Sequence, residues 1–164
     1  MQRLLWLAAV LACLAQRPTL AAPAITQLQR IGSVRVRMTE AELREALGPA
    51  AHQGPFESDA TSGWTNKTWT YSGKGLKVRL TSDGSPRKPW IVCGITATEP
   101  CQLRTSRGLK LGSTRQEVEA AYKGEIDDSA SAVDMIVVGK AEDGVIFRFR
   151  DGKAVEINLG PSAP

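Results

Sequence analysis

Apolar residues recur at helical spacing in two stretches of the chain, 39–47 and 114–122. Each stretch opens with Thr-x-x-Glu, at Thr39 and at Thr114, and the second threonine lies 75 residues after the first. In this capping box, the threonine hydroxyl and the glutamate carboxylate bind backbone N–H groups that have no other partner at a helix start. The pattern therefore predicts two capped helices, and the shared offset indicates an internal duplication.

Stretches of alternating apolar and polar residues follow each helix, which is the pattern of half-buried strands. In one of them, Leu76, Val78 and Leu80 share a face. Lys77 and Arg79 share the other face and are expected to be exposed. The strands expected on this basis are 68–71, 76–81, 90–96, 133–138, 145–150 and 154–159, with short leading strands at 34–36 and 109–111.

The order of these elements predicts an α+β protein. Two tandem helix-plus-antiparallel-meander repeats are expected, with the helices packed on one sheet face. The first repeat is expected at 25–97 and the second at 98–164, packed together as one compact unit.

The final hairpin has two possible registers. A two-residue turn at 151–152 would place Phe147 opposite Glu156 and so bury a carboxylate or expose a ring. A three-residue loop, 150–152, would pair Phe147 with Val155 and keep one face apolar. We therefore expect the three-residue loop.

The chain begins with the features of a targeting segment. A positive start at 1–3 precedes an apolar run at 4–15 that is short for a membrane span, and Ala-Pro-Ala at 22–24 resembles a cleavage site. A signal peptide over 1–24 is predicted, which makes the mature protein periplasmic or secreted. The alternatives are a buried N-terminal helix and a lipoprotein signal, in which a lipid on Cys13 would anchor the protein to a membrane.

The charge of the mature chain is nearly balanced. Removal of the signal peptide leaves 19 lysines and arginines against 17 aspartates and glutamates. So small a surplus argues against a nucleic-acid-binding protein, for which a strongly basic balance is typical.

Cleavage also leaves Cys93 and Cys101 as an even pair in a compartment that permits disulfides. Gly94 and Pro100 lie between them and allow the chain to turn back. We expect a Cys93–Cys101 disulfide, with Cys93 on the same core face as Ile95; two free thiols are the alternative.

The sequence contains no recognisable set of catalytic or metal-binding residues. His52 is the only histidine and lies in a loop rich in glycine and proline. The acidic pair at 127–128 lacks the spacing of a calcium loop, and no helix follows Gly-Lys-Gly at 73–75 to form a phosphate site. Because an enzyme needs a positioned acid, base or nucleophile, we expect a protein that is not an enzyme and has no metal and no cofactor.

Several short motifs resemble those of a known family. Motifs at 38–39, 47–49, 54–55 and 69–71 resemble the signature of the small outer-membrane assembly lipoproteins, in which a helix ends in Leu-Gly-x-Pro and a Trp-x-Tyr strand follows. The stretches 108–114 and 118–122 look like the related repeat of β-lactamase-inhibitor-protein-like domains, which are tandem versions of the same unit. The resemblance covers nearly all of the mature chain and implies action by protein–protein contact. No inhibitory contact residue of those domains has a recognisable counterpart here.

These observations predict a non-catalytic exported module that binds other proteins in the periplasm or cell envelope, as an inhibitor, an immunity-type protein or an envelope-assembly factor. Its expected contact surface is the long loop 82–89. There Arg87 and Lys88 would face an acidic partner surface, with Trp90 and Trp64 as aromatic anchors. The alternative is a periplasmic binder of a small molecule or glycan in the groove between the two repeats.

Overall fold

The computed structural model describes residues 30–58, 63–85, 88–140 and 144–160. The predicted signal peptide, Cys13 and Arg87 lie outside the described residues. Within the described ranges, no helix is both long enough and apolar enough to cross a membrane.

Both predicted helices are present, and both capping boxes are confirmed. α2 (Glu40–Leu47) begins after Thr39, whose hydroxyl accepts from the N–H of Glu42 at 3.3 Å while its own N–H donates to the Glu42 carboxylate at 2.7 Å. α3 (Arg115–Ala121) begins in the same way after Thr114, with distances of 3.2 Å and 2.7 Å. The bond from the threonine N–H lowers the pKa of each glutamate carboxyl.

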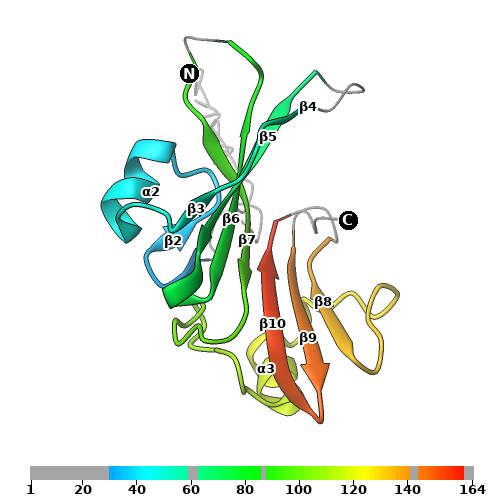
Figure 1. Cartoon of the computed structure of the whole chain (residues 1–164). Coiled ribbons are helices and arrows are strands. Elements are labelled where there is room, and N and C mark those ends of the chain that lie inside the picture. Colours follow the sequence, from blue (N-terminus) through cyan, green and yellow to red (C-terminus); the bar gives the residue numbers. More distant parts are fainter. Residues whose placement is uncertain (1–29, 59–62, 86–87, 141–143, 161–164) are drawn as a thin grey trace, which may run out of the picture.

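Eight of the described strands form one antiparallel sheet in the order β3-β5-β6-β7-β10-β9-β8, with β4 also paired to β5 (Figure 1). β1 and β2 form a separate hairpin, and of the two expected leading strands only 34–36 has a counterpart, in β2. The strands are β1 (Arg30–Ile31), β2 (Val34–Arg35), β3 (His52–Gln53), β4 (Glu57–Ser58), β5 (Thr65–Tyr71), β6 (Leu76–Ser82), β7 (Ile91–Ala97), β8 (Met135–Val138), β9 (Val145–Arg150) and β10 (Lys153–Leu159).

The two halves of the chain join where β7 pairs with β10, and we call this junction the seam. These strands run antiparallel, with Thr96 opposite Asn158 and Ile95 opposite Leu159. The predicted α+β class is therefore wrong. The described part of the chain is mostly β, with 42% of its residues in strands and 15% in helices, and it is organised around one large sheet instead of two helix-plus-meander repeats packed on a sheet. The alternation of residues predicts single strands but not which edges pair, and the pairing at this seam closes two edges that would otherwise be open.

The expected three-residue loop of the last hairpin is also wrong. The loop is a two-residue turn at 151–152, with φ of 52° and 72°, as the sequence Asp-Gly favours. Phe147 nevertheless pairs with Ile157 and not with Glu156, because the register of β10 shifts by one residue at Val155. This bulge absorbs one residue, so the apolar residues on both sides of it stay on the core face.

A second bulge, in β7, moves Cys93 off the expected face. Along the pairing with β6, Gly94 and Val92 oppose consecutive residues, so that Cys93 is the extra residue of β7. Val92 and Ile95 are both buried, whereas Ile91 is 36% exposed. The expectation of a shared face for Cys93 and Ile95 fails because one extra residue reverses the alternation.

Cys93 and Cys101 are free thiols, so the predicted disulfide is not present in the structure. Cys93 lies four residues before the end of β7 at Ala97, a strand length of roughly 13 Å. Cys101 lies beyond that end, where its N–H donates to the carbonyl oxygen of Thr98 at 2.8 Å. A bridge needs Cα atoms within about 7 Å, and the extended strand separates the two cysteines by more than this.

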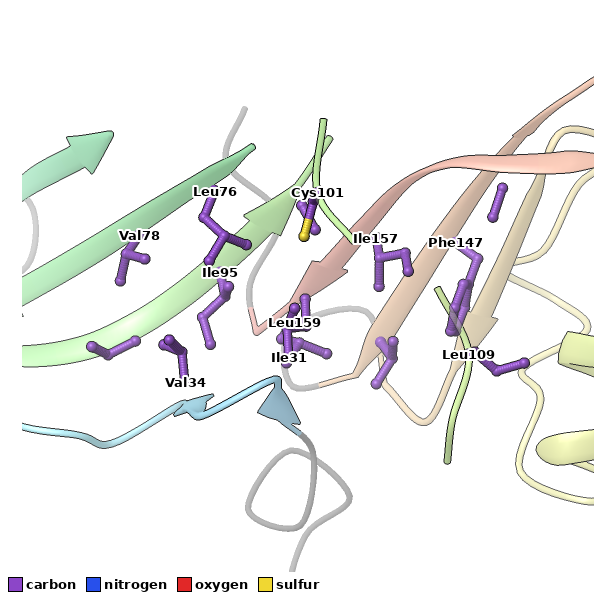
Figure 2. Packing of buried hydrophobic residues seen from close by; sticks show 14 of the residues in the cluster. Ile31, Val34, Leu76, Val78, Ile95, Cys101, Leu109, Phe147, Ile157 and Leu159 are labelled. Atoms are coloured by element: carbon purple, nitrogen blue, oxygen red, sulfur yellow. The ribbon is translucent and has the colours of Figure 1, made fainter. Parts of the chain in front are cut away.

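The core lies on one face of the sheet and continues across the seam (Figure 2). Ile95 of β7 and Leu159 of β10 are each 1% exposed. Ile31 and Val34 of the β1–β2 hairpin point toward the sheet from the other side of the core. Ile31 also forms a β-bridge with Thr105, so the hairpin covers the seam and binds the second half of the chain.

The turn between β5 and β6 offers a test of the packing beside the seam. The short 3-10 helix Ser72–Lys74 ends at Gly75, whose φ is 61°, and a Cβ there would overlap the carbonyl oxygen of Thr98. We expect Gly75→Ala to lower the free energy of unfolding by about 3 kcal/mol, through backbone strain and overpacking. Gly73→Ala is the control, because a Cβ at Gly73 meets nothing within 4 Å, and it should change stability by less than about 0.5 kcal/mol. Chemical denaturation measures both; equal losses would contradict this packing.

Candidate functional site

The sequence-predicted aromatic residues lie at one end of the sheet, where β4 pairs with the start of β5 and where β7 begins (Figure 1). Trp64 directly precedes β5, and Trp90 directly precedes β7. Phe56 joins them from the segment between β3 and β4. We call Phe56, Trp64 and Trp90 the aromatic tip.

A buried lysine lies beneath the tip. Lys67 of β5 is 9% exposed, and its Nζ lies 4.2 Å from the ring centroid of Trp90, 5.1 Å from that of Trp69 and 5.8 Å from that of Phe56. The rings of Phe56 and Trp90 contact each other, with their centroids 5.6 Å apart. A cation this close to ring faces is stabilised by their electrons. Lys67 therefore connects the exposed Phe56 to Trp69 in the core.

The first turn of α2 supplies the opposite charge. Lys67 Nζ donates to one carboxylate oxygen of Glu40 at 2.6 Å, and Arg44 donates to the other at 3.0 Å. The Arg44 guanidinium lies 4.4 Å from the ring centroid of Trp69, and the N–H of Glu40 donates to the carbonyl oxygen of Trp90 at 2.9 Å. The helix start and the two tryptophans are thus held together by one charged network.

The network changes the acidity of Glu40. Burial alone would raise the pKa of its carboxyl, but the hydrogen bonds from Lys67 and Arg44 outweigh burial and bring the pKa below its ordinary value of 4.5. A carboxyl with a lowered pKa stabilises the folded state above its unfolded-state pKa, and this contribution is lost as the pH falls through the lowered value. The ion pair therefore supports the tip at neutral pH and weakens in acid.

Lys88, the described cation of the predicted contact loop, already has a partner in that loop. Its Nζ donates to Asp83 at 2.5 Å, although its side chain is 69% exposed. This bond lowers the pKa of the Asp83 carboxyl. Because Lys88 is already paired within the loop, the described part of the loop presents little net charge. The aromatic surface of Trp90 beside it is the better candidate for contact with a partner.

The face of the sheet away from the core carries the charge instead. Lys77 and Arg79 lie there as predicted, and Arg148 and Arg150 of β9 are exposed on the same face. At the seam this face contains a hollow of about 240 Å³. We call it the seam hollow, and its polar lining and floor are Thr68, Lys77, Arg79, Gly94, Thr96 and Asn158.

The seam hollow is one of the hollows between the two predicted repeats. Another, of about 360 Å³, is lined by Ser33, Ala46, Leu47, Gly73, Lys74, Pro100, Gln102 and Leu103, and it has no aromatic lining either. On the core side, Ile95, Leu159 and Ile31 fill the seam (Figure 2). No aromatic side chain of the described residues lines the seam hollow. Sites for small molecules are mostly lined by apolar and aromatic side chains, so the hollow lacks the lining that the predicted glycan or small-molecule site would need.

The described residues bring no catalytic group into a reactive arrangement. They contain no cluster of three or more His, Cys, Asp or Glu side chains that could hold a metal ion. His52 is exposed in β3, opposite Thr70. The Asp127 carboxylate accepts hydrogen bonds from Ser129 and Ala130 of its own loop, and the bond from the Ser129 hydroxyl lowers its pKa most. These contacts are those of a turn, not of an active site.

Comparison of the chain with protein-family models, with curated proteins and with solved structures finds no match. The resemblance to β-lactamase-inhibitor-protein-like domains and to the assembly lipoproteins therefore stays a prediction from short motifs.

Sequence reasoning did not assign Lys67 or Phe56 to the site. Lys67 alternates in step with Trp69 and Tyr71 along β5, and a lysine in an apolar row is a signal for a buried, paired cation. Phe56 lies between two strands of two residues each, which are too short to leave a periodic pattern. Its position beside Trp90 depends on tertiary packing alone.

The two helices offer a matched test of the buried ion pair. Glu40→Gln leaves the buried Lys67 ammonium without its carboxylate, so we expect the free energy of unfolding at about pH 7 to fall by about 2–3 kcal/mol. Glu119 pairs with Arg115 on the exposed surface of α3 at 2.8 Å. Glu119→Gln should therefore cost about 0.5 kcal/mol or less.

The pH dependence of the same pair gives a second readout. Because the pKa of Glu40 is lowered in the folded state, the difference between the unchanged protein and Glu40→Gln should shrink as the pH falls from about 7 to about 3. Denaturation curves at both pH values measure it. Equal losses in the two glutamine variants, or a Glu40→Gln loss that persists in acid, would contradict the role given to this carboxylate.

Proposed function

We propose that the chain is a non-catalytic protein-binding module and that the aromatic tip is its contact surface. The observation that carries the proposal is the exposure of two large rings at one end of the sheet: Phe56 is 69% exposed and Trp64 is 45% exposed. Aromatic side chains gathered in this way are typical of protein interfaces, where they supply most of the binding energy.

Phe56 has the properties of an anchor. Covering a ring of this size contributes roughly 3 kcal/mol. The ring already packs against Trp90, with centroids 5.6 Å apart, and lies over the Lys67–Glu40 ion pair. Since the ring is held before a partner arrives, little side-chain freedom is lost on binding, and more of the contact energy remains as affinity.

The proposed place of action is the periplasm or the cell envelope. The predicted signal peptide supports export, and the proposed partner is another envelope or exported protein. An inhibitor, an immunity-type protein and an envelope-assembly factor all act through such a contact. Attachment to a membrane is part of the proposal only if Cys13 is lipidated.

A small molecule or glycan is the second candidate, because the seam hollow gathers polar groups from β6, β7 and β10 at the junction of the two halves. Its volume of about 240 Å³ is below the roughly 300–1,000 Å³ of most ligand pockets. The exposed rings lie elsewhere, at the aromatic tip. Protein contact is therefore the function that the geometry favours.

Site-specific photocrosslinking tests the proposed contact surface. Benzoylphenylalanine is placed at position 56 and the protein is expressed in its host cell, then irradiated and analysed by mass spectrometry. We expect a discrete product that joins the chain to one other protein, because the ring at this position lies at the proposed interface. Val133, which is 94% exposed in the loop before β8, is the control position and should give no such product.

Two results would contradict the proposal. One is the same set of products from positions 56 and 133, which would indicate random collisions. The other is the absence of any protein product at position 56 while a small molecule or glycan raises the melting temperature of the purified protein.

A further inference from the structure

The seam hollow combines groups from both halves on the open face of the sheet. Lys77 lies opposite Thr96 across β6 and β7, and Thr96 lies opposite Asn158 across β7 and β10. Lys67 and Trp69 point to the other face, toward the core. The hollow is therefore separate from the aromatic tip, and a ligand in the hollow would not touch the tip.

Gly94 gives the hollow its floor and places a guanidinium above it. Gly94 pairs with Arg79, and a Cβ built on Gly94 would lie 3.6 Å from both Nε and Nη2 of Arg79. The guanidinium therefore lies across the bare backbone of Gly94. A larger side chain at this position would fill the floor and push the guanidinium outward.

Lys77, which is exposed, is the charge at the hollow for which the described residues supply no ion-pair partner. The carboxylate of β10 on this face, Glu156, already accepts from Arg148 at 3.2 Å and from Asn158 Nδ2 at 2.7 Å. The Thr96 hydroxyl donates to Asn158 Oδ1 at 2.7 Å, so this polar row is fixed in place.

From this arrangement we infer that the seam hollow binds the carboxylate of an aspartate or glutamate side chain presented by a protein partner, with Lys77 and Arg79 as the donors. Hydrogen bonds from charged donors to a carboxylate are the strongest that side chains make. A hollow of about 240 Å³ is small for a free ligand but large enough for one carboxylate. The remaining affinity comes from the surrounding face, which also carries Arg148 and Arg150.

The probe for this site is a fluorescein-labelled octaglutamate peptide, titrated against the purified full chain and followed by fluorescence anisotropy. Lys77→Gln removes one donor, and Gly94→Val keeps every charge but fills the floor. Lys153→Gln is the matched control, because it removes one exposed lysine of the same sheet outside the hollow. We expect each of the first two changes to raise Kd about tenfold, and Lys153→Gln to raise it about twofold or less.

The following results would overturn the inference. Equal losses in Lys77→Gln and Lys153→Gln, or an unchanged Kd in Gly94→Val, would show that the peptide responds only to overall charge. Free glutarate that competes as well as unlabelled octaglutamate would show a small-molecule site. If Gly94→Val does not fold, the comparison of Lys77→Gln with Lys153→Gln decides alone, and equal losses in these two variants overturn the inference.

Discussion

The pairing of β7 with β10 is the constraint on which the rest of the structure depends. The paired residues run from Ile95 opposite Leu159 to Ala97 opposite Ile157. This short pairing joins the strands of both halves into one sheet. Because the sheet is continuous, the apolar faces of both halves form one core, which the β1–β2 hairpin covers at the seam. The helices contribute less, since each has a single fully buried side chain, Leu43 in α2 and Val118 in α3. The outer edge is also protected, because Val138 of β8 forms a bridge with Ile126.

The sheet separates two surfaces that rely on different physical effects. On the core side, at one end, the Lys67–Glu40 ion pair supports Phe56 and Trp90 of the aromatic tip, where the proposed partner would remove apolar surface from water. On the open side, the seam hollow exists only because β7 and β10 are neighbours and Gly94 leaves space under Arg79. There the proposed gain comes from electrostatic attraction, which weakens as the salt concentration rises. A partner could use either surface without the other.

What the sequence predicts correctly is local. The capping boxes at Thr39 and Thr114 and the outward position of Lys77 depend on neighbours within a few residues or on simple alternation. The main errors are of register or pairing: the bulges at Cys93 and Val155 and the strand order at the seam are decided by packing between distant segments. The same limit applies to the site. Trp64 and Trp90 are recognisable as aromatic residues beside strands, whereas the contact of Phe56 with Trp90 and Lys67 exists only in the folded chain. A pattern of single residues does not contain such contacts.

Native-state hydrogen exchange at the seam tests the central claim, which is that β7 and β10 belong to one cooperative sheet. Mass spectrometry or NMR gives opening free energies for the amides of 95–97 and 157–159 as denaturant is added below the unfolding midpoint. If the two strands are paired as described, both segments open together at the free energy of global unfolding, with exchange rates within about tenfold of each other. If β10 exchanges more than about a hundredfold faster than β7 under the same conditions, the two halves open independently and the single-sheet account is contradicted.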